Sequence, residues 1–242
     1  MGETHFGFEK VQTEEKAKRV EQVFADIAKN YDLINDLASL GLHRYWKRRA
    51  IAGVSSSRPH RVVDLAGGTG DLTRLMMTQS PESLVILSDI NQAMLMAGGE
   101  KLHRENLHPP LLQCDAESLP FEDASVDLIM IGFGLRNVTH KLRALKEMRR
   151  VLRRQGQVLV LEFSRVAAAL KPFYEVYSFH VLPLLGKWLA GNEAGYRYLV
   201  ESIRMHPDQA TLAAMMREAG FARVSYTNLT AGIVAIHTGF VE

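Results

Sequence analysis

The segment 64–71, DLAGGTGD, combines an acid with a turn that only small residues fit. Without Cβ atoms, Gly67, Gly68 and Gly70 can take positive φ angles and let the backbone come close to a ligand. The helix that we expect from about residue 70 would point its free N–H groups at the same place. The segment therefore predicts the floor of a cofactor site.

The type of cofactor follows from the residues around the glycines. The dinucleotide fingerprint G-x-G-x-x-G, aligned on Gly68 and Gly70, meets Thr73 at its third glycine position, which disfavours a nicotinamide or flavin. Asp64 suits a cation better than a pyrophosphate, and S-adenosylmethionine carries a sulfonium and an ammonium. The turn resembles the D-x-G-x-G-x-G turn of class I methyltransferases, with Ala66 at the first glycine position. On this segment alone, a glycine turn without a ligand stays open.

Two more acids follow predicted strands. Asp89 ends the apolar run 84–88, and an acid about 20 residues past the glycine turn can accept both ribose hydroxyls of a nucleoside. The alternative is a cap for the helix from residue 91, but Asn91 can cap that helix itself. Asp115 follows the run 111–114 at the sheet edge where ligands bind, and its carboxylate can accept from an adenine amino group.

The apolar pattern alternates as βαβ units do. Strands are expected near 61–65, 84–88, 111–114, 126–131 and 157–163, separated by helices over about 70–79, 91–104 and 142–152. Gly156 is expected to cap the last of these helices. A helix over 208–219 and two strands, 221–229 and 232–241, close the chain as an antiparallel hairpin.

Two regions flank this core. A helix is expected from Thr13, with an apolar stripe that continues to Tyr31, and a second one over about 43–52, where basic residues surround Trp46. A solvated helix face with a core tryptophan is favoured there over a lipid-binding one. We divide the chain into an N-terminal helical extension (1–58), a cofactor-binding core (59–163), an aromatic-rich, substrate-covering insertion (164–206) and a closing helix with hairpin (207–242).

Composition favours one globular domain. The 242 residues are 47% hydrophobic, and the 29 basic and 27 acidic residues leave a net charge of +2, which gives no argument for a nucleic-acid partner. Cys114 is the single cysteine and is expected to be a small core residue. No apolar run is long enough to span a bilayer, so we expect a cytoplasmic protein, soluble or peripheral at the inner face of the membrane, with no metal.

Several stretches resemble the ubiquinone/menaquinone biosynthesis C-methyltransferases, nearly from end to end. DLAGGTGD alone is moderately specific, whereas FGLRNV, YSFHVLP and SIRMHPDQ in this order and spacing make the match strong. The stretches are THFGF (4–8), YDLINDLASLGLHRYWKR (31–48), DLAGGTGDLT (64–73), SDIN (88–91), FGLRNVT (133–139), LEFS (161–164), YSFHVLP (177–183), YRYLVESIRMHPDQ (196–209) and NLTAGIVAIH (228–237).

The resemblance implies a Rossmann-like class I methyltransferase with a seven-stranded, mostly parallel sheet and helices on both faces. It implies S-adenosylmethionine as cofactor and a reduced polyprenyl quinone as acceptor, either 2-polyprenyl-6-methoxy-1,4-benzoquinol or demethylmenaquinol. A serine common in the family before FGLRN is Gly132 here, and Asn-Ala is often found where Asp115-Ala116 stands. The predicted cofactor contacts are Gly67, Gly68, Thr69, Asp89, Asp115, Ala116 and, through its backbone alone, Gly132.

Carbon methylation needs a ring hydroxyl to lose its proton and push charge onto the adjacent ring carbon. Arg136, just beyond the fourth strand, is the candidate to stabilise the phenolate, and His180, in the insertion, is the candidate base. The alternatives are an arginine that anchors its loop and a histidine packed in a lid.

Other functions stay open on the sequence. A nucleic-acid methyltransferase is disfavoured because the fourth strand ends in GFGLRN and not in an Asn/Asp-Pro-Pro-aromatic turn. Another class I or small-molecule methyltransferase, and a non-catalytic cofactor-binding subunit of a quinone biosynthesis complex, are the alternatives. Peripheral membrane contact or such a complex is a further expectation, and the oligomeric state is left open.

Overall fold

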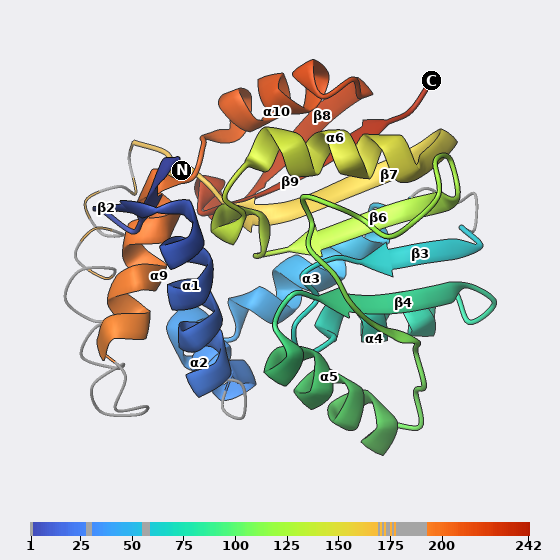
Figure 1. Cartoon of the computed structure of the whole chain (residues 1–242), viewed down its shortest axis with the longest axis horizontal. Coiled ribbons are helices and arrows are strands. Elements are labelled where there is room, and N and C mark those ends of the chain that lie inside the picture. The colour runs from blue at the N-terminus through green and yellow to red at the C-terminus, as the bar shows by residue number, and fades with distance from the viewer. Residues whose placement is uncertain are drawn as a thin grey trace.

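The computed structural model describes residues 2–27, 31–54, 59–168 and 193–242, together with residues 170, 172, 175 and 177. Its centre is a seven-stranded sheet in the order β5-β4-β3-β6-β7-β9-β8 (Figure 1). Five strands of this sheet are parallel: β3 (Arg61–Asp64), β4 (Leu84–Asp89), β5 (Leu111–Gln113), β6 (Val126–Gly132) and β7 (Leu152–Phe163). The predicted order of strands along the chain is confirmed.

The chain closes with β8 (Ala222–Leu229) and β9 (Val234–Phe240), an antiparallel pair joined by a short 3-10 turn, η4 (Thr230–Gly232). β9 inserts between β7 and β8 and runs antiparallel to both. The predicted closing hairpin is therefore correct.

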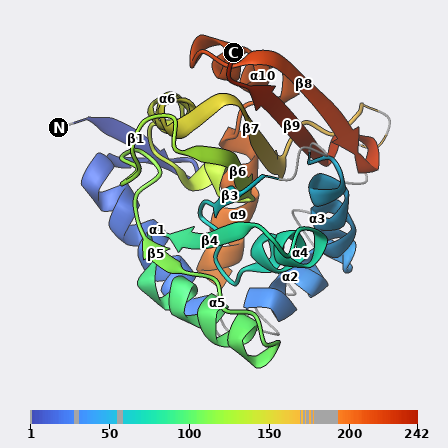
Figure 2. The same ribbon diagram turned by 90° about the vertical axis from the view of Figure 1, so that its right-hand side faces the viewer.

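Strand residues alternate between two apolar layers, as the period of two requires. Val63, Ile129 and Val160 face α6 (Lys141–Val151) and α10 (Gln209–Glu218). Val62 and Leu159 face α3 (Leu42–Ala52) and α4 (Asp71–Gln79). Figure 2 shows α6 on one face of the sheet and α3 and α4 on the other.

The remaining helices lie around the ends of the strands. α5 (Gln92–Arg104) follows β4, and Asn91 accepts from the backbone N–H of Met94 at 3.0 Å, so Asn91 is its N-cap as predicted. In Figure 1, α1 (Thr13–Ile27), α2 (Tyr31–Ser39) and α9 (Glu193–Met205) gather at the left, beyond one end of the sheet.

Two expectations need correction. Residues 3–12, for which no element was predicted, form an antiparallel hairpin of β1 (Glu3–Phe6) and β2 (Glu9–Gln12). The apolar stripe predicted from Thr13 to Tyr31 is helical over α1 and at the start of α2, and residues 28–30 between them lie outside the described residues. Gly156 is not a helix cap, because α6 ends at Val151 and Gly156 lies inside β7, where an added Cβ would meet the Arg153 carbonyl at 2.7 Å. The four-part division of the chain stays a prediction.

Candidate active site

The glycine turn joins β3 to α4 and is held from inside the fold. Asp64, fully buried, accepts from the backbone N–H of Thr73 at 2.9 Å and from its hydroxyl at 2.7 Å. Burial raises the pKa of Asp64 to about 7, against the opposing effect of these two hydrogen bonds. Thr73, which argued against a dinucleotide in the sequence, therefore has a local partner that fixes the start of α4.

Asp89 closes the turn from the end of β4. Its carboxylate accepts from the backbone N–H of Gly68 at 2.9 Å and from that of Asn91 at 2.8 Å. Burial raises the pKa of Asp89, and these backbone donors oppose the shift. A carboxylate has about four acceptor positions, so two remain for a ligand. An added Cβ at Gly68 would meet the methyl of Met94 at 3.0 Å, and its absence keeps the approach to Asp89 open.

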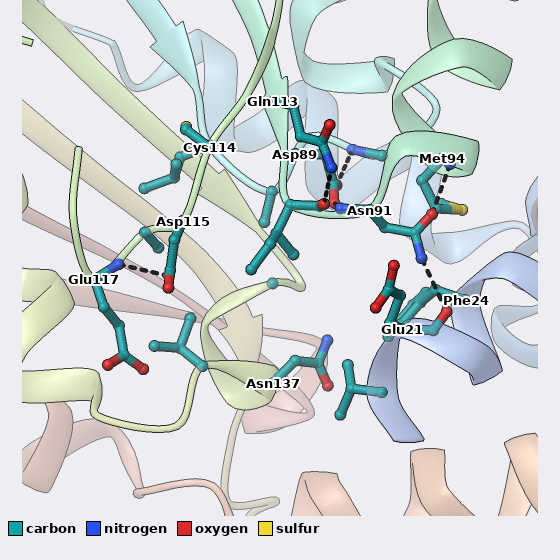
Figure 3. A pocket seen from close by; sticks show the side chains of 18 of the residues that line it. Glu21, Phe24, Asp89, Asn91, Met94, Gln113, Cys114, Asp115, Glu117 and Asn137 are labelled. Carbon is teal, nitrogen blue, oxygen red and sulfur yellow. Dashed lines mark hydrogen bonds between the residues drawn. The ribbon is translucent and has the colours of Figure 1, made fainter. Parts of the chain in front are cut away.

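A pocket of about 360 Å³ opens at these strand ends, which we call the strand-end pocket (Figure 3). Gly68, Asp89, Asp115 and Ala116 line it, while Glu21 and Phe24 cover it from α1. Asp115 accepts from the backbone N–H of Glu117 at 2.9 Å and stands at the far end of the pocket from Met94 (Figure 3). The structure thus brings four of the predicted cofactor positions to one cavity, and their contact with a cofactor stays a prediction.

Cys114 also lines the strand-end pocket. Burial raises the pKa of its thiol to about 11, so the group stays protonated at neutral pH and is a poor nucleophile.

Three other predicted positions lie behind the pocket wall. Gly67 donates its backbone N–H to the Ser88 carbonyl at 2.8 Å and packs against β4. Thr69 donates its hydroxyl to Asp32 at 2.7 Å. Gly132 ends β6, and an added Cβ there would meet Leu72 at 2.8 Å. The structure therefore gives Phe133 and Gly134, and not Gly132, a place in the wall.

A chain of charged groups continues from Thr69 and ties α2 to the cofactor side. Lys101 donates to Asp32 and, at 2.7 Å, to Asp71; Lys47 donates to the other oxygen of Asp71 at 2.6 Å. Burial alone would raise the pKa of Asp71, but the charges of Lys47 and Lys101 outweigh it and hold the pKa below its ordinary value. This chain fastens α2 and α3 over the start of α4.

A second pocket of about 300 Å³, the apolar pocket, adjoins the first. Its wall combines residues from α2, α3, η2, β7 and α9 with single residues after β7 and after η4, and it is mostly hydrocarbon and aromatic ring. The residues that give it this character are Leu40, Trp46, Phe163, Tyr177, Leu199 and Ile233. Trp46 donates its indole N–H to the hydroxyl of Thr230 at 2.7 Å, which fixes α3 against η4.

Tyr31 and Phe133 belong to the walls of both pockets. Phe133 has a left-handed backbone, with φ of 57°, and its flanking residues Gly132 and Gly134 leave room for that conformation. Its ring packs on Trp46 and Phe163, with centroids 6.2 and 4.9 Å away. The two pockets are therefore neighbours separated by aromatic rings.

Arg136 lies in the 3-10 turn η2 (Leu135–Asn137), three residues after Phe133, and lines the apolar pocket. Its guanidinium donates to Glu162 at 3.1 Å and to the Phe133 carbonyl; both ionic side chains are almost fully buried. Glu162 also accepts from the backbone N–H groups of Arg136 and Phe163. The Nε of Arg136 has no hydrogen-bond partner among the described residues. The arginine is anchored on one edge and carries an unused donor on the other.

His180, the predicted base, lies outside the described residues. Sequence reasoning passed over Asn137, which lines the strand-end pocket and accepts from the Tyr198 hydroxyl at 3.0 Å. It also passed over Glu162, although both residues stand in the quoted stretches FGLRNVT and LEFS. Those stretches could have pointed to both residues. The pairing of Arg136 with Glu162 could not be predicted from a local sequence pattern, because it joins the ends of two different strands.

The chain matches the model of the ubiE/COQ5 methyltransferase family over residues 12–241. It is 55% identical over 239 residues to the ubiquinone/menaquinone biosynthesis C-methyltransferase UbiE of Bordetella avium, covering 98% of this chain and 93% of that one. It is 52% identical over 240 residues to the UbiE protein of Cupriavidus necator, covering 99% of both chains.

Among solved structures, a SAM-dependent methyltransferase from Thermotoga maritima superposes with a TM-score of 0.62 at 16% sequence identity. The match covers 91% of this chain and 99% of that one. At this identity the likeness concerns the fold, and it confirms the Rossmann-like class I methyltransferase architecture predicted from the sequence.

Proposed function

This chain belongs to the ubiE/COQ5 methyltransferase family, and on that premise we propose that it methylates a ring carbon of a reduced polyprenyl quinone. It is a methyltransferase, and its cofactor is S-adenosylmethionine. The relatives are named for C-methylation in ubiquinone and menaquinone biosynthesis. The single observation that carries the choice of acceptor is the apolar pocket, which shares Tyr31 and Phe133 with the strand-end pocket.

The strand-end pocket suits the cofactor chemically. Asp89 keeps two acceptor positions for ribose hydroxyls, and Asp115 offers a carboxylate at the far end of the pocket for an amino group. Bound S-adenosylmethionine supplies an electrophilic methyl group. The glycine turn and Asp89 orient the cofactor, and Tyr31 and Phe133 keep its reacting end beside the acceptor, so that positioning contributes to the rate.

The apolar pocket suits a quinol ring with an isoprenoid tail, because its wall is apolar except at a few places. One of these is Arg136, whose guanidinium lines the pocket and can donate to a phenolate oxygen as the ring hydroxyl loses its proton. The electron pair of that O–H bond would move into the ring, and the adjacent ring carbon would bond to the methyl carbon as the S–CH3 bond breaks and its electron pair stays on the sulfur of S-adenosylhomocysteine. The same ring carbon would then lose its own proton, which restores the aromatic ring and the hydroquinol. We keep His180 as the proposed base that takes the phenolic proton.

Because Glu162 neutralises Arg136, the pair brings no net charge to an empty apolar pocket. A developing phenolate then meets a guanidinium whose position is already fixed by Glu162 and by the Phe163 ring, 5.5 Å from the guanidinium carbon. Such preorganised donors stabilise a transition state without reorganisation during the reaction.

We also propose peripheral contact with the cytoplasmic face of a membrane. Among the described residues, no helix is both long and apolar enough to cross a bilayer. Leu40, in the wall of the apolar pocket, is 76% exposed, and Tyr45 and Arg48 are exposed on the adjacent α3. A tail that leaves the pocket beside Leu40 would meet lipid there. Of the basic residues of α3, Lys47 does not add to this surface, because it is buried against Asp71.

The decisive experiment uses methyl-labelled S-adenosylmethionine with short-tailed benzoquinol and demethylnaphthoquinol acceptors. We expect label on a ring carbon of the quinol and none with the same quinone in its oxidised form, which has no phenolic proton to lose. Label on oxygen, or equal transfer to quinol and quinone, would contradict the proposed reaction.

A further inference from the structure

A separate cavity of about 200 Å³ lies on the other side of Arg136, between the N-terminal hairpin, α6 and α9. We call it the basic cavity. Lys16 from α1, Lys141 from α6 and Arg136 from η2 all line it, and the hydroxyl-bearing residues Thr139 and Ser202 join them. No aspartate or glutamate is among its lining residues. The cavity therefore concentrates positive charge and hydrogen-bond donors in a small volume.

Neither lysine has an ion-pair partner among the described residues. Lys16 is only 5% exposed and makes no hydrogen bond or ion pair with the described part of the chain. Lys141 donates to the Val138 carbonyl at 3.0 Å, which is a neutral partner. Burial lowers the pKa of both lysines, for Lys141 to about 8, and the charge of Lys16 contributes to the shift at Lys141.

The nearest carboxylates are engaged elsewhere. Glu117 accepts from the backbone and ring of His140, and Glu162 is bound to Arg136. Both raise the pKa of Lys141 only from a distance, and that effect is smaller than the effect of burial. The protein alone thus leaves two neighbouring ammonium groups, one buried and one partly buried, without a directly bound carboxylate, and a bound anion would supply one.

The hairpin closes the cavity by specific contacts. The Phe6 ring stacks on Tyr198 with centroids 4.3 Å apart, and Glu201 accepts from the backbone N–H of Phe8 at 3.2 Å. An added Cβ at Gly7 would collide with the carboxylate of Glu201. The residues around the cavity therefore come from four separate segments that a central ligand would join.

We propose that the basic cavity binds a small oxyanion of the phosphate class, held between Lys16, Lys141 and Arg136. Its size fits a phosphate group and not a nucleotide, and lysine with arginine is the usual donor set for such an anion. The phosphate has two sources, free in solution or on a lipid headgroup. The cavity shares Arg136 with the apolar pocket and Thr139 with the strand-end pocket, but its two lysines belong to neither, and the proposed anion binding does not depend on the proposed methyl transfer.

Thermal unfolding of the full-length chain in inorganic phosphate, against chloride at equal ionic strength, tests the site. For a dissociation constant of about 1 mM, about 10 mM phosphate should raise the melting temperature by about 3 to 6 °C. Lys16→Gln and Lys141→Gln should lose this rise, while the exposed Lys18→Gln on α1 and Lys146→Gln on α6 keep it. In chloride the two cavity variants should be at least as stable as wild type, because each removes a repulsive buried charge.

A lipid source is tested with vesicles of phosphatidylglycerol in phosphatidylcholine. Flotation that Lys16→Gln and Lys141→Gln abolish, and that both surface controls retain, would assign the oxyanion to lipid. If the glutamine variants fail to fold, Lys16→Met keeps the apolar stem, and saturable broadening of the phosphorus NMR signal by wild-type protein replaces the comparison. A response to neither phosphate nor vesicles, or an equal response in the cavity and control variants, overturns the proposal.

Discussion

The strand-end pocket and the apolar pocket share Tyr31 and Phe133 but are assembled in different ways. Most of the strand-end pocket comes from loops that directly follow β3, β4, β5 and β6, so each polar group is set by the strand before it. The apolar pocket takes its walls from α2, α3, η2, β7, α9 and Ile233, which span much of the chain. One pocket depends on local turns, whereas the other depends on the packing of distant segments.

The two pockets also differ in the chemistry of their walls. In the strand-end pocket a buried carboxylate and backbone groups point at the ligand, so single contacts decide affinity. In the apolar pocket most of the wall is hydrocarbon, and the buried cations Arg136 and Lys47 have their own counter-ions in Glu162 and Asp71. A change in the first pocket should therefore alter cofactor binding, and a change in the second should alter quinol turnover.

The largest effect is expected for Asp89→Ala in the strand-end pocket. The change removes a charged acceptor from two ribose hydroxyls, each hydrogen bond contributing about 1.5 to 3 kcal/mol, so S-adenosylmethionine should bind about 10²- to 10⁴-fold more weakly. Calorimetry measures this affinity. Glu82→Ala, an exposed acid before β4, is the control and should bind the cofactor normally. Normal cofactor affinity in folded Asp89→Ala would exclude Asp89 as the ribose acceptor.

Arg136→Lys should impair quinol turnover in the apolar pocket and leave the strand-end pocket unaffected. Lysine keeps a charge for Glu162 but loses the second donor edge, so the turnover number for quinol should fall by about 10²- to 10³-fold, with cofactor affinity unchanged. Arg154→Lys, on the exposed part of β7, is the matched control. If Arg136→Lys turns over quinol at the normal rate, Arg136 only anchors its loop.

The proposed base gives a pH signature that separates the two roles. Where Arg136→Lys lowers the pH-rate profile as a whole, His180→Ala should flatten its acid limb, because the base must be unprotonated to accept the phenolic proton. An unchanged acid limb in His180→Ala would move the base to another residue of the insertion.

His206 should make stability, and not catalysis, depend on pH. Burial lowers its pKa to about 4, from an ordinary value of 6.5, and neither ring nitrogen has a partner among the described residues. Between these values the unfolded chain binds a proton that the folded chain does not, so the free energy of unfolding falls as pH falls through this window. The loss should reach about 3 kcal/mol at the acid end.

Urea unfolding from neutral pH down to the acid end of this window measures the dependence. His206→Gln should show a smaller decline than wild type, whereas His60→Gln, at an exposed position before β3, should match wild type. An identical decline in all three proteins would show that His206 does not cause it.

The smallest effect is expected for Trp46→Phe. The change removes the hydrogen bond to Thr230, 184 positions away in the chain, and should cost about 0.5 to 1.5 kcal/mol of stability. It should also raise the KM for quinol, by the factor that corresponds to the same free-energy change, and leave cofactor affinity unchanged. Thr230→Ala should have the same effect, and the double variant should be no worse than either single one, since both remove one interaction.

The contrast between the pockets also explains what the sequence could predict. The glycines, Asp89 and Asp115 stand at the ends of apolar runs, so the order of strands and the polar positions of the strand-end pocket followed from local pattern. Seven strands and their antiparallel closing pair were likewise recognisable from alternation, turns and the family resemblance.

What the pattern missed depends on contacts between distant segments. Gly156 resembled a helix cap, but β7 begins at Leu152, because Leu152 pairs with Val126 of β6. The β1–β2 hairpin is too short and polar to stand out, and it is held by Tyr198 and Glu201 of α9. The hydroxyl of Thr69 donates to Asp32 of α2, an acid that no local motif connects with the turn, and the contact of Thr69 with the cofactor stays a prediction.

The shared wall of the two pockets has a thermodynamic consequence. Tyr31 and Phe133 cannot shift for one ligand without changing the surface that the other ligand meets. If cofactor binding changes quinol affinity by some factor, linkage requires that quinol binding change cofactor affinity by the same factor. Any movement of these two shared aromatic rings on binding one ligand therefore links the dissociation constant of the cofactor to that of the quinol.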